Sequence, residues 1–185
     1  MPHVHVLTSG YVGERVASTV SLIEAEGALL VVDPGMVSSP SVILDPIARL
    51  GHQVEDITDV IISHHHPDHT INIALFPNAR LHDHWAIYEN DIWTSRPAEG
   101  FEVANGVTLW ETPGHTAQDI TTMVDDDDDV VALTHLWWFQ SGPSEDPVAT
   151  DVEALHYGRE RVLGRATLII PGHGEMFTPD QSTPR

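Results

Sequence analysis

Histidine and aspartate cluster in the middle of the chain in a pattern that suits metal binding. One seven-residue stretch reads Ser-His-His-His-Pro-Asp-His, which gives the spacing His64-X-His66-X-Asp68-His69. Neutral imidazole and carboxylate are the ligands that proteins offer to zinc, iron or manganese without thiolates, and the chain has no cysteine. In an extended segment His64 and His66 point to the same side. A turn after the proline would direct Asp68 and His69 to a second position, so we expect two pairs of ligands from one loop.

Neither pair completes the coordination shell of an ion, so further ligands must come from elsewhere in the chain. His115, His135 and His173 are available, and each follows an apolar segment within a few residues. A surface histidine tract or an expression tag is the alternative explanation of the cluster, but a tag does not fit a position in mid-sequence after an apolar run. We expect histidines from separate stretches to meet around at least one transition-metal ion.

Apolar segments and turn signals predict the elements that must bring these side chains together. Alternating or β-branched runs favour strands, and Gly, Pro and Asp at their ends mark turns. Val152, Leu155 and Val162 share one face of a predicted helix, and Ser39 is the expected N-cap of another, with Pro40 at its first position. Strands are expected at 4–7, 18–25, 28–32, 59–63, 80–82, 107–111, 119–124, 130–134 and 167–170, and helices at 39–50, 68–75, 84–89 and 151–163.

The order of these elements predicts a single α/β domain over residues 1–185 with two strand-rich halves. Each candidate histidine lies just past the end of a predicted strand, and loops at a rigid sheet edge are where sites usually lie. The acidic run at 125–129 separates two strands and lacks the alternating spacing and glycine of a calcium loop. We therefore interpret this run as a solvated hairpin tip.

The motifs together resemble the metallo-β-lactamase superfamily. The resemblance rests on His64-X-His66-X-Asp68-His69, on Thr-Pro-Gly-His ending at His115, on Pro-Gly-His-Gly around His173, and on the turn after residues 30–32 that contains Asp33. Residues 75–77 and 133–147 are similar to the branch of metallo-β-lactamase domain-containing protein 1. The resemblance implies a four-layer αββα sandwich with metals at one edge. It also implies two ligand sets: His64, His66 and His115 for the first metal, and Asp68, His69 and His173 for the second. Asp33 would either orient a ligand histidine or serve only as a turn residue.

One residue departs from the pattern of the family. The family usually has an aspartate after the strand at 130–134, and that carboxylate bridges both metals, whereas this chain has Thr134-His135. A neutral imidazole has one free lone pair and does not normally bridge two ions. We expect His135 to bind one metal, the second, with a role as a non-ligand as the alternative. The substitution would weaken the second site, change the metal preference, or leave an enzyme with one ion.

The ligand set predicts hydrolytic chemistry. A bound divalent ion lowers the pKa of water towards about 7, which supplies hydroxide at neutral pH without a protein nucleophile. We expect Asp68 to orient the nucleophile and pass a proton to the leaving group. The favoured substrates are a small ester, thioester, lactone or amide. The alternatives are a metal-dependent phosphodiesterase or ribonuclease, a redox enzyme with one iron, and a metal-binding protein without turnover.

Charge and hydropathy restrict the partners. The formal net charge is −20, with eight arginines and no lysine, and such a surface repels polyanions, so nucleic acid is disfavoured. A high-salt habitat and a GC-rich genome explain the acidity equally well. No segment has the roughly 18 apolar residues of a membrane span, and the N-terminus lacks the pattern of a signal peptide. We expect a cytoplasmic protein that acts on a small molecule.

Two groups of aromatic residues have no assigned role in this scheme. An aromatic wall beside the metals would favour an apolar or planar substrate, whereas packing in the core or in a homodimer is the alternative for at least half of them. The groups are Trp137, Trp138 and Phe139, and Trp85, Tyr88 and Trp93.

Overall fold

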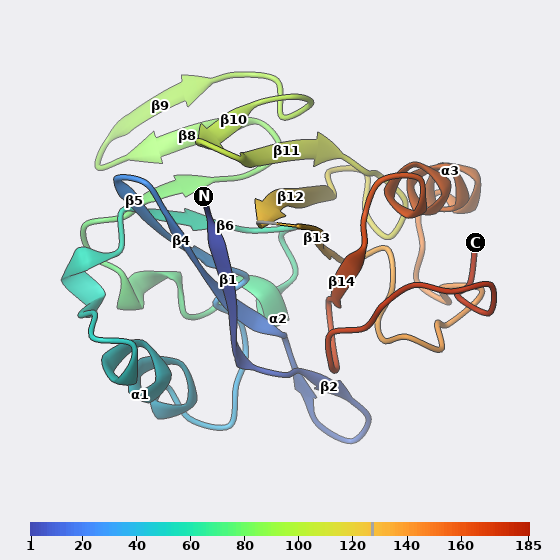
Figure 1. The fold of residues 1–185 in the computed structure, drawn as a ribbon, viewed down its shortest axis with the longest axis horizontal. Helices are drawn as coiled ribbons and strands as arrows, with labels where there is room; N and C mark the ends of the chain where they lie inside the picture. Colours follow the sequence, from blue (N-terminus) through green and yellow to red (C-terminus); the bar gives the residue numbers. More distant parts are fainter. Residues whose placement is uncertain (127) are drawn as a thin grey trace.

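Two β-sheets stack face to face at the centre of the protein (Figure 1). This computed structural model describes residues 1–126 and 128–185. The first sheet has its strands in the order β1-β4-β5-β6-β7-β8-β9, and β5, β6 and β7 run parallel while the flanking pairs are antiparallel. Its strands are β1 (His3–Thr8), β4 (Val20–Ala25), β5 (Ala28–Val32), β6 (Asp59–Ile61), β7 (Arg80–His82), β8 (Ala86–Glu89) and β9 (Ile92–Ser95).

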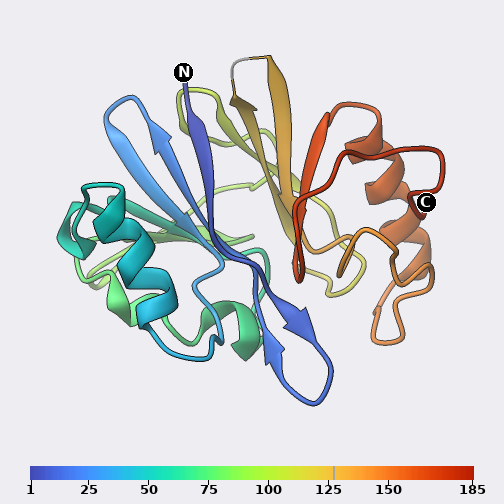
Figure 2. The ribbon, with the colours of Figure 1, turned by 60° about the horizontal axis from the view of Figure 1, so that its bottom comes forward.

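The second sheet has the order β10-β11-β12-β13-β14, with a parallel pairing only between β13 and β14. A separate two-stranded hairpin of β2 and β3 projects beyond the sandwich (Figure 2). The strands are β10 (Glu102–Ala104), β11 (Val107–Glu111), β12 (Ile120–Asp126), β13 (Asp129–Thr134), β14 (Leu168–Pro171), β2 (Tyr11–Val12) and β3 (Val16–Ala17).

Helices cover the outer face of each sheet, which completes four layers. Helix α1 (Ser41–Arg49) packs on the first sheet and α3 (Val152–Leu163) packs on the second, on opposite sides of the molecule (Figure 2). The remaining helical segments are in the connections between strands of the first sheet. They are α2 (Pro67–Thr70) and the 3-10 turns η1 (Val54–Asp56) and η2 (Ile73–Leu75). The predicted αββα sandwich is confirmed.

The alternation of each strand explains the layers, because successive side chains point to opposite faces. In β13, Val131 and Leu133 face the core between the sheets, whereas Ala132 faces α3. In β5, Val32 faces the core between the sheets and Val31 faces α1. Strands β5 and β13, which are covered on both faces, therefore contain continuous apolar runs.

Three details of the predicted elements are wrong. The helix expected at 68–75 is the short helix α2 followed by the separate 3-10 turn η2. The helix expected at 84–89 is β8, which pairs with β9 across a turn where Asn90 has a φ of 55°. Helix α1 begins at Ser41 with Pro40 as its N-cap, so the cap lies one residue later than Ser39. The Ser39 hydroxyl lies 3.0 Å from the Ser41 hydroxyl and accepts a long bond of 3.4 Å from the Ser41 amide. The acidic run does form a hairpin, since Asp126 pairs with Asp129, while Asp127 lies outside the described residues.

The topology carries the candidate ligands to one edge of the sandwich. Strands β11, β13 and β14 run in one direction, so the loops after them leave the second sheet on the same side. The loop after β6 meets this edge from the first sheet, and the Ile120 amide donates to the Ser63 carbonyl at 2.9 Å across the two sheets. Among the described residues, no helix has the length and apolar character needed to cross a membrane.

Candidate metal centre

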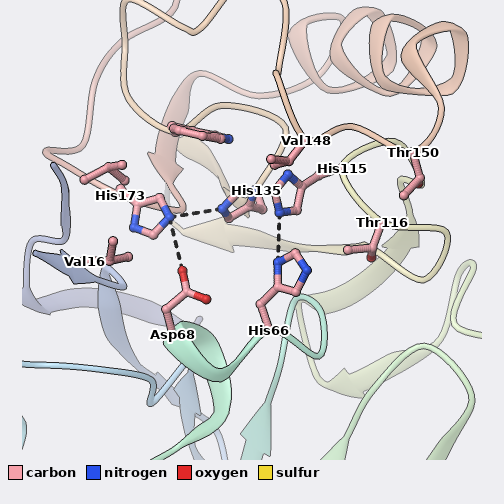
Figure 3. A pocket seen from close by; sticks show the side chains of 11 residues that line it. Val16, His66, Asp68, His115, Thr116, His135, Val148, Thr150 and His173 are labelled. Atoms are coloured by element: carbon pink, nitrogen blue, oxygen red, sulfur yellow. Dashed lines mark hydrogen bonds and ion pairs between the residues drawn. The ribbon is translucent and has the colours of Figure 1, made fainter. Parts of the chain in front are cut away.

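Three histidines from two loops direct ring nitrogens at one another where the sheets meet. His64 and His66 follow β6, and His115 follows β11. Nδ1 of His66 lies 3.0 Å from Nε2 of His64 and 3.1 Å from Nε2 of His115, and Figure 3 shows the second of these contacts. One tetrahedral zinc ion with bonds of about 2.0 Å keeps its nitrogen ligands about 3.3 Å apart. The three nitrogens therefore have the separation expected of ligands around one ion.

A carboxylate and two further histidines form a second group beside the first. Oδ2 of Asp68, in α2, lies 3.5 Å from Nε2 of His69 and 3.6 Å from Nε2 of His173, and Figure 3 shows Asp68 directed at His173. Nε2 of His69 is enclosed and has no hydrogen-bond partner among the described residues. A buried lone pair without a partner is costly unless a cation satisfies it, so the donors present fit a metal ion.

Oxygen atoms hold the opposite ring nitrogen of three buried histidines. In each case the Nδ1–H donates, so the lone pair of Nε2 is free and faces the centre. The pairs are His69 with Asp33 Oδ2 at 2.8 Å, His115 with Asp146 Oδ2 at 2.7 Å, and His173 with the Ala17 carbonyl at 2.7 Å.

Asp33 connects the turn after β5 to both ligand groups. Its φ of 53° places it in the left-handed region, and its Oδ1 accepts from the Ser63 amide at 2.6 Å. The Ser63 hydroxyl donates to Asp33 Oδ2 at 2.7 Å, so its oxygen accepts from Nδ1–H of His64 at 3.0 Å. Asp33 is therefore both a turn residue and a residue that orients ligands, which the sequence left as alternatives.

Burial sets the protonation of these groups. It lowers the pKa of His64 and of His135 well below 6.5, so both imidazoles are neutral at pH 7. For His69 burial acts in the same direction, but the carboxylates of Asp33, Asp68 and Asp119 together outweigh it and raise the pKa of His69. Burial also raises the pKa of Asp119 to about 6, against the hydrogen bonds that it accepts from Thr116.

His135 lies between the two groups. Its Nε2 is 3.2 Å from Nε2 of His173, and its ring centroid is 4.7 Å from that of His64 and 4.8 Å from that of His69. The side chain is buried, and Nδ1 has no partner among the described residues. One nitrogen each of His64, His69 and His135 lie close enough together to hold an ion. His135 therefore contacts His173 of the second group and also lies near His115 of the first, with ring centroids 4.2 Å apart.

A pocket of about 380 Å³ opens over the histidines (Figure 3). Its polar side is made of candidate ligands, and its other walls are largely apolar and come from the β2–β3 hairpin and from the segments after β13. The lining residues are Val12, Val16, His66, Asp68, His115, Thr116, His135, Trp138, Val148, Thr150 and His173.

The aromatic residues and the remaining histidines divide between the pocket and the rest of the molecule. Trp138 lines the pocket, whereas Trp137 is fully buried in the core between the second sheet and α3. Trp85 and Trp93 are exposed outside the pocket lining. His65 is exposed, and its ring lies tilted against that of Trp85 with ring centroids 5.0 Å apart. His82, His84 and His156 also lie outside the lining.

Two buried carboxylates beside the ligands were missed from the sequence. Asp146 accepts from His115, and Oδ1 of Asp119 lies 3.8 Å from Nδ1 of His64. Asp119 is only four residues after His115 and directly precedes β12, which is a usable signal. Asp146 is 31 residues from its partner in an irregular loop, and no local pattern pointed to it.

Comparisons with known proteins agree with this geometry. The family model described as the metallo-beta-lactamase superfamily matches residues 13–176. Metallo-beta-lactamase domain-containing protein 1 of Xenopus laevis is 30% identical over 191 residues, which cover 95% of this chain and 82% of the frog protein.

Solved structures share the fold. A putative metallo-beta-lactamase from Thermotoga maritima has a TM-score of 0.76 at 22% identity, and the match covers 96% of this chain and 99% of that one. The dizinc quorum-quenching lactonase AidC, solved with the product N-hexanoyl-L-homoserine, has a TM-score of 0.63 at 17% identity over 84% of this chain and 72% of that one.

Proposed function

Because the chain belongs to the metallo-β-lactamase superfamily of metallo-hydrolases, we propose that it hydrolyses a small, uncharged ester, thioester, lactone or amide. The observation that supports this most directly is the convergence of imidazole lone pairs and one carboxylate at the floor of a single pocket. When divalent ions are bound there, they acidify water and polarise the carbonyl of the substrate.

The roles of the residues follow from their positions. We assign His64, His66 and His115 to the first ion, and Asp68, His69 and His173 to the second, with His135 as a further ligand of the second. Asp68 is half-buried and lines the pocket, so its carboxylate reaches both the ligand cluster and a bound substrate. We propose that it orients the attacking water and carries a proton to the leaving group.

The walls of the pocket support an uncharged substrate. Val12, Val16, Trp138 and Val148 contribute apolar surface, and no arginine is among the lining residues that the structure describes. A phosphodiester or a nucleic acid would need cationic contacts there, so the phosphodiesterase and ribonuclease alternatives have less support. A substrate with an apolar acyl or alkyl group beside its carbonyl fits the lining best.

Zinc is the metal that we propose, because imidazole and carboxylate donors suit it, although the same donors also accept iron and manganese. Cytoplasmic location and a homodimer remain predictions from the sequence. Fractionation of cells and sedimentation of the purified protein, respectively, test them.

The test of the proposed function is a substrate panel on protein that is stripped with chelator and reloaded with zinc, iron or manganese. Chromogenic esters, thioesters, lactones, amides and phosphodiesters are assayed with each form. We expect turnover of an ester or lactone by reloaded protein and none by stripped protein. Turnover of phosphodiesters alone would refute the substrate class, and no turnover by fully loaded protein would favour a binding protein.

The chain offers a matched pair of variants for this assay. His66→Ala removes a proposed ligand, whereas His65→Ala removes an exposed neighbour in the same loop. We expect the first to lose turnover and metal and the second to retain both. Equal behaviour of the two would contradict the ligand assignment.

A further inference from the structure

We propose that Asp146 is a positioning residue that couples the first metal site to the wall of the substrate pocket. A role of Asp146 in catalysis rests on the proposed function. The coupling itself depends only on one carboxylate oxygen and the two side chains that donate hydrogen bonds to it.

A single oxygen atom of Asp146 accepts two hydrogen bonds. Oδ2 accepts from Nδ1–H of His115 at 2.7 Å and from Nε1–H of Trp138 at 3.1 Å. His115 belongs to the first ligand group and Trp138 lines the pocket, so the carboxylate joins a ligand to a wall. Asp146 is itself buried, which makes each bond stronger than it would be in water.

The loop that carries Asp146 is fixed from the opposite side by a buried arginine. Arg159 in α3 donates through Nη1 to the Ser144 carbonyl at 2.7 Å and through Nη2 to the Pro143 carbonyl at 2.8 Å. Its Nε–H donates to the Leu136 carbonyl at 2.9 Å. The guanidinium therefore ties residues 136 and 143–144 to α3, in a loop between β13 and α3 that contains no helix or strand. Such support suits a residue whose carboxylate must stay in place.

The same oxygen also accounts for the tautomer of His115. With its proton held on Nδ1 by Asp146, the lone pair of Nε2 is left to face His66. Carboxylates that accept from a ligand histidine fix the ring and make it a better donor to the metal. When an ion binds Nε2, the Nδ1–H becomes more acidic and its bond to Asp146 strengthens. Trp138 shares that acceptor, so its environment should change with occupancy of the first site.

Direct coordination is the competing role. Asp146 lies close enough to His115 and His135 for the three to hold an ion. In that arrangement His115 would bind through Nδ1, and its Nε2 would no longer serve the ion shared with His66. The 2.7 Å contact between Nδ1 and Oδ2 favours the hydrogen bond, because ligand atoms around one zinc ion lie about 3.3 Å apart.

The experiment compares Asp146→Ala, Asp146→Asn and Asp59→Asn. Asp59 is a buried carboxylate that accepts from His82 at 2.7 Å, away from the pocket, so its variant controls for lost stability alone. Zinc content is measured in chelator-buffered zinc, and tryptophan emission is followed as zinc is added, with Trp138→Phe identifying the signal.

We expect Asp146→Ala to bind the first ion about 10- to 100-fold more weakly and to lose the emission change of Trp138. Asn retains a carbonyl oxygen, so Asp146→Asn should lose much less, and Asp59→Asn should bind zinc as the wild type does. Wild-type affinity in Asp146→Ala would overturn the proposal. An equal loss in the Asn and Ala variants would overturn it in favour of direct coordination. If the Ala variant does not fold, Asp146→Asn decides by itself, because a 10- to 100-fold loss of zinc affinity in that variant would overturn the proposal in the same way.

None of these measurements requires turnover. If the zinc and emission results are as expected and no substrate is hydrolysed, the proposed function fails while the coupling stands. If substrates are hydrolysed and Asp146→Ala binds zinc normally, only the coupling fails.

Discussion

Gly35 offers a steric test of how the second ligand group is positioned. It ends the turn after β5, and its backbone lies directly against the segment that contains Asp68 and His69. A Cβ added at Gly35 would overlap the Asp68 carbonyl group and lie 2.5 Å from Cα of His69. The φ of Gly35 is not in the left-handed region, so alanine there would be strained only by this contact.

The structure gives the size of the displacement. Ordinary contacts of a Cβ begin at 3.4 Å, so Cα of His69 must retreat by about 0.9 Å and the Asp68 carbonyl by more. Distances between a metal ion and its ligand atoms vary by only about 0.2 Å around their usual values. Gly35→Ala should therefore abolish binding of the second ion. Because the neighbours are backbone atoms that cannot rotate away, we also expect a loss of stability of about 3 kcal/mol, at the upper end of overpacking effects.

Two other glycines provide controls. Gly13→Ala in the β2–β3 loop meets nothing within 4 Å and should behave as the wild type. Gly114→Ala would lie 2.6 Å from Cα of Leu155 and should displace the adjacent His115, which weakens the first ion instead. The assay is metal content after equilibration in buffered zinc, together with urea unfolding. Two ions bound with wild-type affinity in Gly35→Ala would refute the assignment of Asp68 and His69 to a metal.

Three further predictions concern the pocket and its floor. His135→Asp should strengthen occupancy of the second site, and unchanged stoichiometry and affinity would count against His135 as a ligand. In metal-free protein, burial holds the pKa of His135 well below the 6.5 of the unfolded chain. Unfolding therefore takes up a proton below pH 6.5, and the free energy of unfolding decreases as the pH is lowered. His135→Asn removes that proton uptake. Below pH 6.5 the difference in free energy of unfolding between wild type and variant should therefore shift by about 1.4 kcal/mol per pH unit in favour of the variant. A difference that stays constant with pH in urea unfolding would contradict this. Trp138→Ala should raise KM for an ester with an apolar acyl group by about tenfold or more, because about 1.5–3 kcal/mol of apolar contact is lost. The effect on acetyl esters should be smaller. Equal effects on both kinds of ester would argue against an apolar wall.

Local sequence signals predicted most of the sandwich because its buried strands are apolar and its turns carry Gly, Pro and Asp. Strand β8 was missed because Ala86–Glu89 is short and its partner β9 is exposed, so neither has the apolar run that marks a buried strand. The Asn90-Asp91 turn between them was the one local signal of a β-hairpin, because asparagine tolerates a positive φ. Tertiary pairing, rather than local propensity, decided this segment.

The candidate ligands carry a signal in the sequence that the residues supporting them do not. His64, His66, Asp68 and His69 lie within six residues, so their spacing in the sequence carries the geometry. The partners that orient them are distant: Asp33 lies 36 residues from His69, and Asp146 lies 31 residues from His115. A buried carboxylate in a loop has no periodicity, so only the folded chain reveals which histidine it serves.

The histidine at position 135 changes how two ions would be held. A bridging carboxylate ties both ions to one side chain, whereas a neutral imidazole gives its single lone pair to one of them. With Nε2 of His135 beside His173, the proposed second site has four protein ligands, which is the number found in closed structural zinc sites. The proposed first site has three histidines, which leaves a fourth position open towards the pocket, as in zinc sites that perform catalysis. The chemistry should therefore follow occupancy of the first site, and filling the second should act mainly through the position of Asp68.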